Sequence, residues 1–101
     1  MVGVIKIPLA ENQLFGTADF IWQATETNHK YDEFLGDLIT TYRITIIYPD
    51  SKIFNTTKTY FWSQMFAHDE EYKRDRIESA IHGDALRWIA ARGVAGRKEQ
   101  F

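Results

Sequence analysis

The clearest pattern in this chain is the run Leu38-Ile39-Thr40-Thr41-Tyr42-Arg43-Ile44-Thr45-Ile46-Ile47-Tyr48, in which apolar and polar residues alternate. A period of two is typical of a β-strand with one buried face and one face in water. The apolar face holds Tyr42, Ile44, Ile46 and Tyr48. The opposite face holds Thr41, Arg43 and Thr45. Pro49-Asp50 then predicts a turn, because Pro presets a backbone angle and Asp hydrogen-bonds to the nearby backbone.

A second strand is predicted from Lys52 to Trp62, where Thr and aromatic residues are frequent. The length of the intervening loop determines which side chains share the apolar face. A loop of three or five residues places Phe54, Tyr60 and Trp62 beside Tyr42 and Ile44. A loop of four residues places Ile53, Thr57 and Phe61 there instead. We favour the first alternative because it buries more aromatic surface, although it leaves Lys58 on the inner face, where its amine must reach water.

The N-terminal part of the chain predicts two more strands. Residues 2–9 form a short one, which Pro8 restricts to an edge because it cannot donate a ladder hydrogen bond. Residues 11–13 are expected to connect it to a strand over residues 16–27, with Ala18, Phe20, Trp22 and Ala24 on one face. The polar interval 28–37 predicts a loop or a single helical turn closed by Gly36. We expect its Phe34 and Leu35 to be packed into the core, although a loop of this length is also a place where function can lie.

The C-terminal part predicts an amphipathic helix. Apolar residues recur at spacings of three and four, namely Ile77, Ala80, Ile81, Ala85, Trp88 and Ile89. Asp69 and Ser63 are the two candidate N-caps, and Gly93 is the expected C-cap, with residues 93–101 as a frayed tail. Gly83 either interrupts the helix, with Asp84 capping a second one, or is passed by a single helix. We favour the single helix because the apolar stripe keeps its phase.

Together these patterns predict an α+β fold: one domain over residues 1–101, with an antiparallel sheet of three or four strands and one C-terminal helix packed on one face. The predicted core holds Phe20, Trp22, Tyr42, Ile44, Ile46, Phe54, Tyr60, Trp62, Ile77, Ile81, Trp88 and Ile89.

Composition excludes several classes of function. The 101 residues contain no Cys, so thiol nucleophiles, disulfides and zinc–thiolate sites are excluded. The first ten residues lack the basic start of a signal peptide, and no apolar run approaches the roughly 20 residues of a membrane span. We therefore expect a cytoplasmic protein without a membrane partner. The net charge of −2 does not favour nucleic acid.

Candidate chemical groups do not form recognisable motifs. His29, His68 and His82 lack the spacing of a metal site, and no Ser lies in a nucleophile elbow. The clustered acids, such as those at 69–71, are typical of a solvated helix start rather than of an acid–base pair. We expect no catalytic, metal or cofactor site and a protein that is not an enzyme.

Protein binding is the function that these observations favour. A sheet covered by one helix leaves a face and an edge strand free, and aromatic and Arg residues are preferred at interfaces. The candidate partner-binding residues are Ile21, Tyr31, Arg43, Ile47, Lys58 and Phe61. We expect a regulator or inhibitor that occupies a surface of a larger protein or complex, a profile shared by inhibitors from phages and mobile elements. The alternative is an RNA- or single-stranded-DNA-binding domain that uses a sheet face, and a homodimer through a strand edge is compatible with either.

Overall fold

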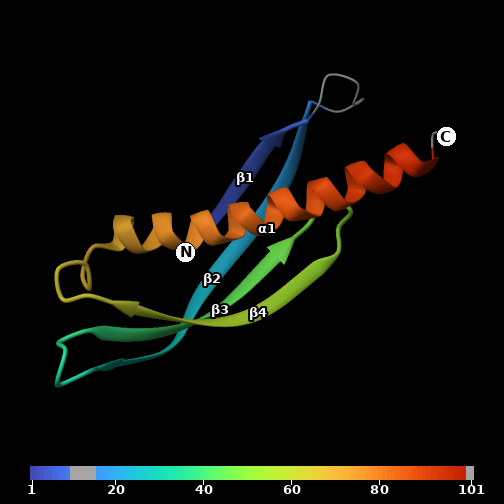
Figure 1. Ribbon diagram of the computed structural model, residues 1–101. Helices are drawn as coiled ribbons and strands as arrows, with labels where there is room; N and C mark the ends of the chain where they lie inside the picture. The colour runs from blue at the N-terminus through green and yellow to red at the C-terminus, as the bar shows by residue number, and fades with distance from the viewer. Residues whose placement is uncertain (10–15, 100–101) are drawn as a thin grey trace.

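The computed structural model describes residues 1–9 and 16–99, with side chains as far as Arg92. Four strands are followed by one long helix in the described residues, and Figure 1 shows how they are arranged. Their bounds are β1 Val2–Pro8, β2 Thr17–Tyr31, β3 Leu38–Ile47, β4 Ile53–Trp62 and α1 Glu70–Glu99. The connector predicted over residues 11–13 lies outside the described residues.

The strands form one antiparallel sheet in the order β1-β2-β3-β4, so every pair of sequence neighbours is also a pair of spatial neighbours. Helix α1 crosses one face of this sheet diagonally (Figure 1). This arrangement confirms the predicted α+β class, the four-stranded alternative and the single C-terminal helix. The face that α1 does not cover is called the open face below.

The core lies between the sheet and α1. Its largest fully buried side chains are Phe20 and Trp22 of β2, Ile44 and Ile46 of β3, and Ile77 and Ile81 of α1. Every second residue is buried along β3 and along residues 17–24 of β2, as the alternating patterns predict. The predicted core residues Tyr60, Trp88 and Ile89 are only partly buried, and the prediction for Phe54 is wrong, because its side chain is 47% exposed on the edge strand β4.

The turn between β3 and β4 has five residues. Ile47 pairs with Ile53, and Tyr48 N–H donates to the Lys52 carbonyl at 3.0 Å. Asp50 Oδ1 accepts a hydrogen bond from Lys52 N–H, which is the role predicted for an Asp after Pro. The five-residue alternative is therefore confirmed, and Lys58 lies opposite Tyr42 on the side of the sheet that faces the helix.

The prediction that β2 ends near Thr27 is wrong. A bulge between Glu26 and Asn28 shifts the register, after which β2 continues to Tyr31 and pairs with the start of β3. Only Asp32 to Asp37 remain as a turn, with Gly36 at a φ of 71°. The physical reason is that residues 28–31 are exposed, so an apolar pattern does not mark this end of the strand.

Helix α1 starts directly after Asp69, whose Oδ1 accepts a hydrogen bond from Tyr72 N–H at 3.0 Å. Asp69, and not Ser63, is thus the N-cap. The helix passes Gly83 without interruption, as favoured above. The predicted cap at Gly93 is wrong, because the helix continues to Glu99. The alanines that neighbour Gly93 are strong helix formers.

Candidate partner-binding site

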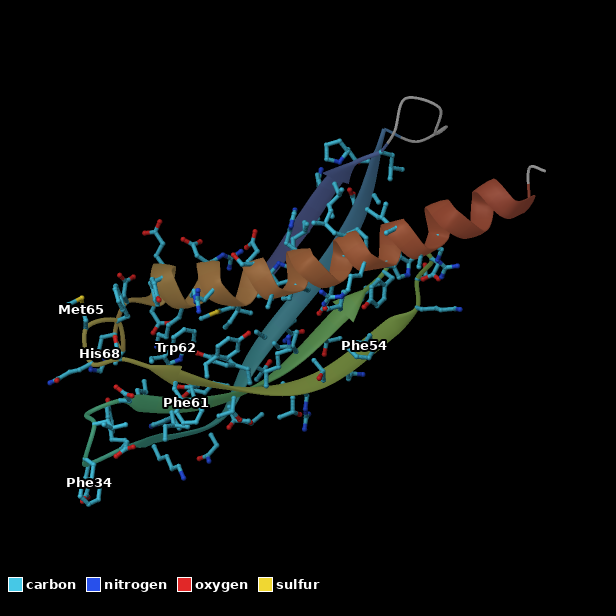
Figure 2. The ribbon with its side chains drawn as sticks, in the orientation of Figure 1. Phe34, Phe54, Phe61, Trp62, Met65 and His68 are labelled. Atoms are coloured by element: carbon cyan, nitrogen blue, oxygen red, sulfur yellow. The ribbon has the colours of Figure 1, made fainter. Side chains whose placement is uncertain are left out.

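The hairpin between β2 and β3 ends in a tip, residues 31–37, that carries apolar side chains in water. Phe34 is 99% exposed and Leu35 is 70% exposed, and Tyr31 at the base of the tip is also exposed. Figure 2 shows Phe34 at the far end of the hairpin, well away from α1. The expectation that Phe34 and Leu35 pack into the core is wrong, since the hairpin extends beyond the region that the helix covers.

Hydrogen bonds hold the backbone of this tip in place. Asp32 Oδ1 accepts from Phe34 N–H at 2.9 Å and from Leu35 N–H at 3.3 Å. The Asp32 carbonyl accepts from Gly36 N–H, and Asp32 N–H donates to the Asp37 carbonyl, both at 2.8 Å. The left-handed backbone of Gly36 suits a residue without a Cβ. The tip therefore presents Phe34 to solvent on an ordered turn.

The charge at the tip is negative. Asp32, Glu33 and Asp37 lie in the turn, and Lys30 is the nearby base. Acidic residues disfavour contact with phosphates, whether of nucleic acid or of an anionic lipid surface. An exposed Phe and Leu with neighbouring carboxylates are instead complementary to a partner surface that has an apolar pocket with a basic rim.

Two further exposed apolar side chains lie on the segments that lead from β4 into α1. Phe61, next to last in β4, pairs with Ile39 and is exposed on the open face. Met65, in the turns before α1, is 82% exposed. Both residues are at the end of the molecule that also carries the tip (Figure 2). This end of the molecule therefore carries several exposed large apolar side chains: Tyr31, Phe34, Leu35, Phe61 and Met65.

The open face carries a second apolar feature. Val4, Ile21, Ile47 and Ile53 are paired in one line across the four strands. We call this line the apolar row. Its members Val4, Ile21 and Ile53 are exposed, with Ile21 at 49%, because α1 covers the opposite face. In an isolated chain this row is in contact with water.

Polar side chains separate the apolar row from Phe61. Thr45 Oγ1 donates to Asn55 Oδ1 at 2.7 Å, and the hydroxyls of Thr41 and Thr59 are 3.2 Å apart. Arg43 stands between them, opposite Thr25 and Thr57. The middle of the open face is thus a band of threonines and one Arg, with apolar groups on both sides of it.

The structure brings four of the six predicted partner-binding residues to the open face, namely Ile21, Arg43, Ile47 and Phe61. Tyr31 instead lies at the tip, and Lys58 lies on the face that α1 covers. The two basic candidates, Arg43 and Lys58, therefore lie on opposite faces of the sheet. The sequence does not predict the exposure of Phe34, Leu35 and Met65, because nothing in their local pattern distinguishes them from core residues.

On the helix side of the sheet, burial raises the pKa of tyrosines that lie beneath α1. Burial raises the pKa of Tyr42, while the nearby ammonium of Lys73 acts in the opposite direction. Lys73 is itself buried, and its Nζ is 2.9 Å from Oε1 of Glu70, which is exposed. Burial likewise raises the pKa of Tyr48 and of Tyr60. Tyr48 stacks on Trp88 of α1, and Tyr42 contacts Tyr60 edge-on, so these groups belong to the packing beneath the helix.

Metal-ligating residues do not gather in residues 1–9 and 16–99, where no group of three or more His, Asp or Glu side chains could hold an ion. Within the same residues, the one helix is not apolar enough over a sufficient length to cross a membrane. Comparison of the chain with protein-family models, with curated proteins and with solved structures finds no match.

Proposed function

We propose that this protein is a small non-enzymatic binding module that inserts the tip of its β2–β3 hairpin into a larger protein or complex and regulates or inhibits it by occupying that surface. The observation that carries this proposal is Phe34, a large apolar side chain that is 99% exposed on a turn ordered by Asp32. Such an anchor is already in place before a partner arrives, so little conformational entropy is lost on binding.

The energetics favour burial of this residue by a partner. Full burial of a Phe or Leu side chain contributes about 1.5–3 kcal/mol. Aromatic anchors that fill a pocket are the side chains that dominate the affinity of protein interfaces. Phe34 and Leu35 together can therefore supply a hot spot, while Tyr31 at the base of the tip adds contact area.

The charge of the tip supports a protein partner over a nucleic acid. Asp32, Glu33 and Asp37 would meet phosphates with repulsion, whereas a pocket rimmed by Lys or Arg would be attracted to them. The open face, with Arg43 and a band of threonines, offers a second contact area beside the anchor. A nucleic-acid complex remains the alternative that the experiment below distinguishes.

Affinity capture from a lysate of the source cells, with and without nuclease treatment, tests the proposal. Wild-type protein is compared with a Phe34→Ser/Leu35→Ser double variant and with Leu86→Ser. Leu86 is a matched control, because it is an exposed apolar residue on α1. We expect a protein retained in stoichiometric amount by the wild type and by Leu86→Ser, and lost with the double variant. Retention that disappears on nuclease treatment, or that does not depend on the tip, contradicts the proposal.

A further inference from the structure

Strand β4 is an edge of the sheet with free backbone groups. In an antiparallel ladder, residues alternate between directing their N–H and C=O toward one neighbour and toward the other. Tyr48 N–H donates to the Lys52 carbonyl, so Lys52 directs its backbone carbonyl toward β3. The even-numbered residues of β4 therefore direct their N–H and C=O groups toward β3. The hydrogen bond from Ala24 N–H to the Met1 carbonyl means that even-numbered residues of β2 bond to β1. Before the bulge in β2, odd-numbered residues of β2 and β3 then bond to each other, which leaves the even-numbered residues of β3 to bond to β4. The odd-numbered residues of β4 therefore direct their backbone N–H and C=O groups away from β3, toward solvent. These residues are Ile53, Asn55, Thr57, Thr59 and Phe61.

This edge carries few of the features that protect edges from pairing. Edge strands are commonly blunted by Pro, by charged residues such as Lys, or by short length. The other edge, β1, has seven residues and ends in Pro8. In contrast, β4 has ten residues, no Pro, and Lys58 as its one charge. Among the described residues no strand pairs with the outer side of β4.

We propose that two copies of this chain pair through their β4 strands, antiparallel, with Thr57 opposite Thr57 of the second copy. The two sheets then form one continuous sheet around a two-fold axis perpendicular to it. In this register each outward-pointing residue faces another, and each such pair exchanges two backbone hydrogen bonds. The facing pairs are Ile53 with Phe61, Asn55 with Thr59, and Thr57 with Thr57.

The side chains select this register over its neighbours. A shift by one step toward the C-terminus places Lys58 opposite Lys58, and facing like charges are destabilising. A shift the other way leaves Phe61 beyond the pairing and places Phe54 opposite Lys58. In the proposed register, Lys58 faces Thr56, and Phe54 faces Tyr60. Phe54, which is half exposed in one chain, then has an aromatic cross-strand neighbour.

The same register joins the two apolar features of the open face. The apolar row ends at Ile53, which meets Phe61 of the second copy, and Phe61 pairs in turn with Ile39 of its own chain. Six apolar residues then lie in one line across the joined sheets: Val4, Ile21, Ile47 and Ile53 of one chain, and Phe61 and Ile39 of the other. This pairing does not depend on the tip as a binding site, and the two tips lie at opposite ends of the assembly.

Cysteine cross-linking tests the register directly, because the chain contains no Cys. Facing hydrogen-bonded residues have Cα atoms about 5.5 Å apart, which a disulfide can span. We expect Thr57→Cys to form a covalent dimer under mild oxidation. Asn55→Cys should not link to itself, but a mixture of Asn55→Cys and Thr59→Cys should link. A chain that stays monomeric, or that links through Asn55→Cys alone, overturns the proposal.

Light scattering with charge variants provides the second test. Wild-type protein should have twice the 11.8 kDa mass of one chain. Thr57→Lys should weaken self-association at least about tenfold, and mixing it with Thr57→Glu should restore a dimer. Thr25→Lys is the control, because Thr25 lies opposite the same Arg43 on the central strand β2. A wild-type monomer, or equal loss with Thr25→Lys, overturns the proposal.

Discussion

Gly3 of β1 lies so close to the indole of Trp22 that a Cβ at position 3 would be 2.6 Å from Trp22 Nε1. The guanidinium of Arg74 lies over the same ring, 5.0 Å from its centroid, so Gly3 and Arg74 both contact one buried Trp. Because Gly3 has no side chain, β1 can lie close to the buried Trp22 in the core between helix and sheet. Arg74 belongs to α1, so this contact links the edge strand β1 to the helix.

Gly3→Ala should destabilise the protein by about 1–3 kcal/mol, because the added methyl overpacks a buried contact. Chemical denaturation measures the change in the free energy of unfolding. Gly16→Ala is the matched control, since within residues 1–9 and 16–99, its chain neighbours aside, no atom lies within 4 Å of a Cβ built at that position. Equal effects at both positions would show that the close approach to Trp22 is absent in solution.

Trp88→Ala should cost about 3–5 kcal/mol of unfolding free energy, a value typical of large-to-small changes at well-packed aromatic residues. Trp88 stacks on Tyr48 at 5.8 Å between centroids, contacts Phe20 edge-on at 5.6 Å, and lies 4.6 Å from the guanidinium carbon of Arg92. Arg92 also pairs with Asp50 in the β3–β4 turn at 2.7 Å. Urea unfolding that changes by less than about 1 kcal/mol would contradict this docking of the helix.

Stability should fall above pH 10. Burial raises the pKa of Tyr42, Tyr48 and Tyr60 above their ordinary 10.0, so the unfolded chain ionises at a lower pH than the folded one. The contribution of these groups is fully present below pH 10 and is lost as the pH rises through the folded pKa values. Urea unfolding between pH 9 and 11 measures this loss, which should be smaller in a Tyr→Phe variant at the three positions. If the variant loses as much stability as the wild type, the loss comes from groups other than these tyrosines.

Asp32→Ala should leave the fold intact and release the tip. The substitution removes the acceptor of the Phe34 and Leu35 amides and should cost about 0.5–2 kcal/mol locally. Amide hydrogen exchange at these two positions should become faster, while exchange in the paired parts of β2 and β3 should not change. The proposed binding should weaken as well, although Phe34 itself is unaltered. Unchanged exchange at Phe34 would mean that Asp32 does not order the turn.

Much of the fold follows from local patterns. Alternation over residues 38–48 predicts which side chains of β3 face the helix, and aromatic burial favours a turn of three or five residues over one of four, of which the structure has five. The end of β2 could not be predicted, because residues 25–31 are exposed on both faces of the strand and show no apolar alternation. Phe54 was misplaced for a related reason, since the helix-facing side of an edge strand extends beyond the helix.

The candidate site was only partly predictable. Ile21 and Ile47 could be assigned to the open face because they interrupt the polar side of their strands. Phe34 and Leu35 could not, since two apolar residues in a short polar loop look the same whether they pack inward or point outward. Their exposure depends on how far the hairpin extends past α1, which is a property of the tertiary structure.

Site-specific photo-cross-linking from position 34 tests the central claim most directly. A photoreactive benzoylphenylalanine replaces Phe34 in one variant and Ser79, an exposed residue of α1, in the other. Both proteins are irradiated in a nuclease-treated lysate of the source cells. The proposed function predicts one dominant protein adduct from position 34, competed by unlabelled wild type, and no such adduct from position 79. Equal labelling from both positions, or no adduct from position 34, would contradict the tip as the site of partner binding.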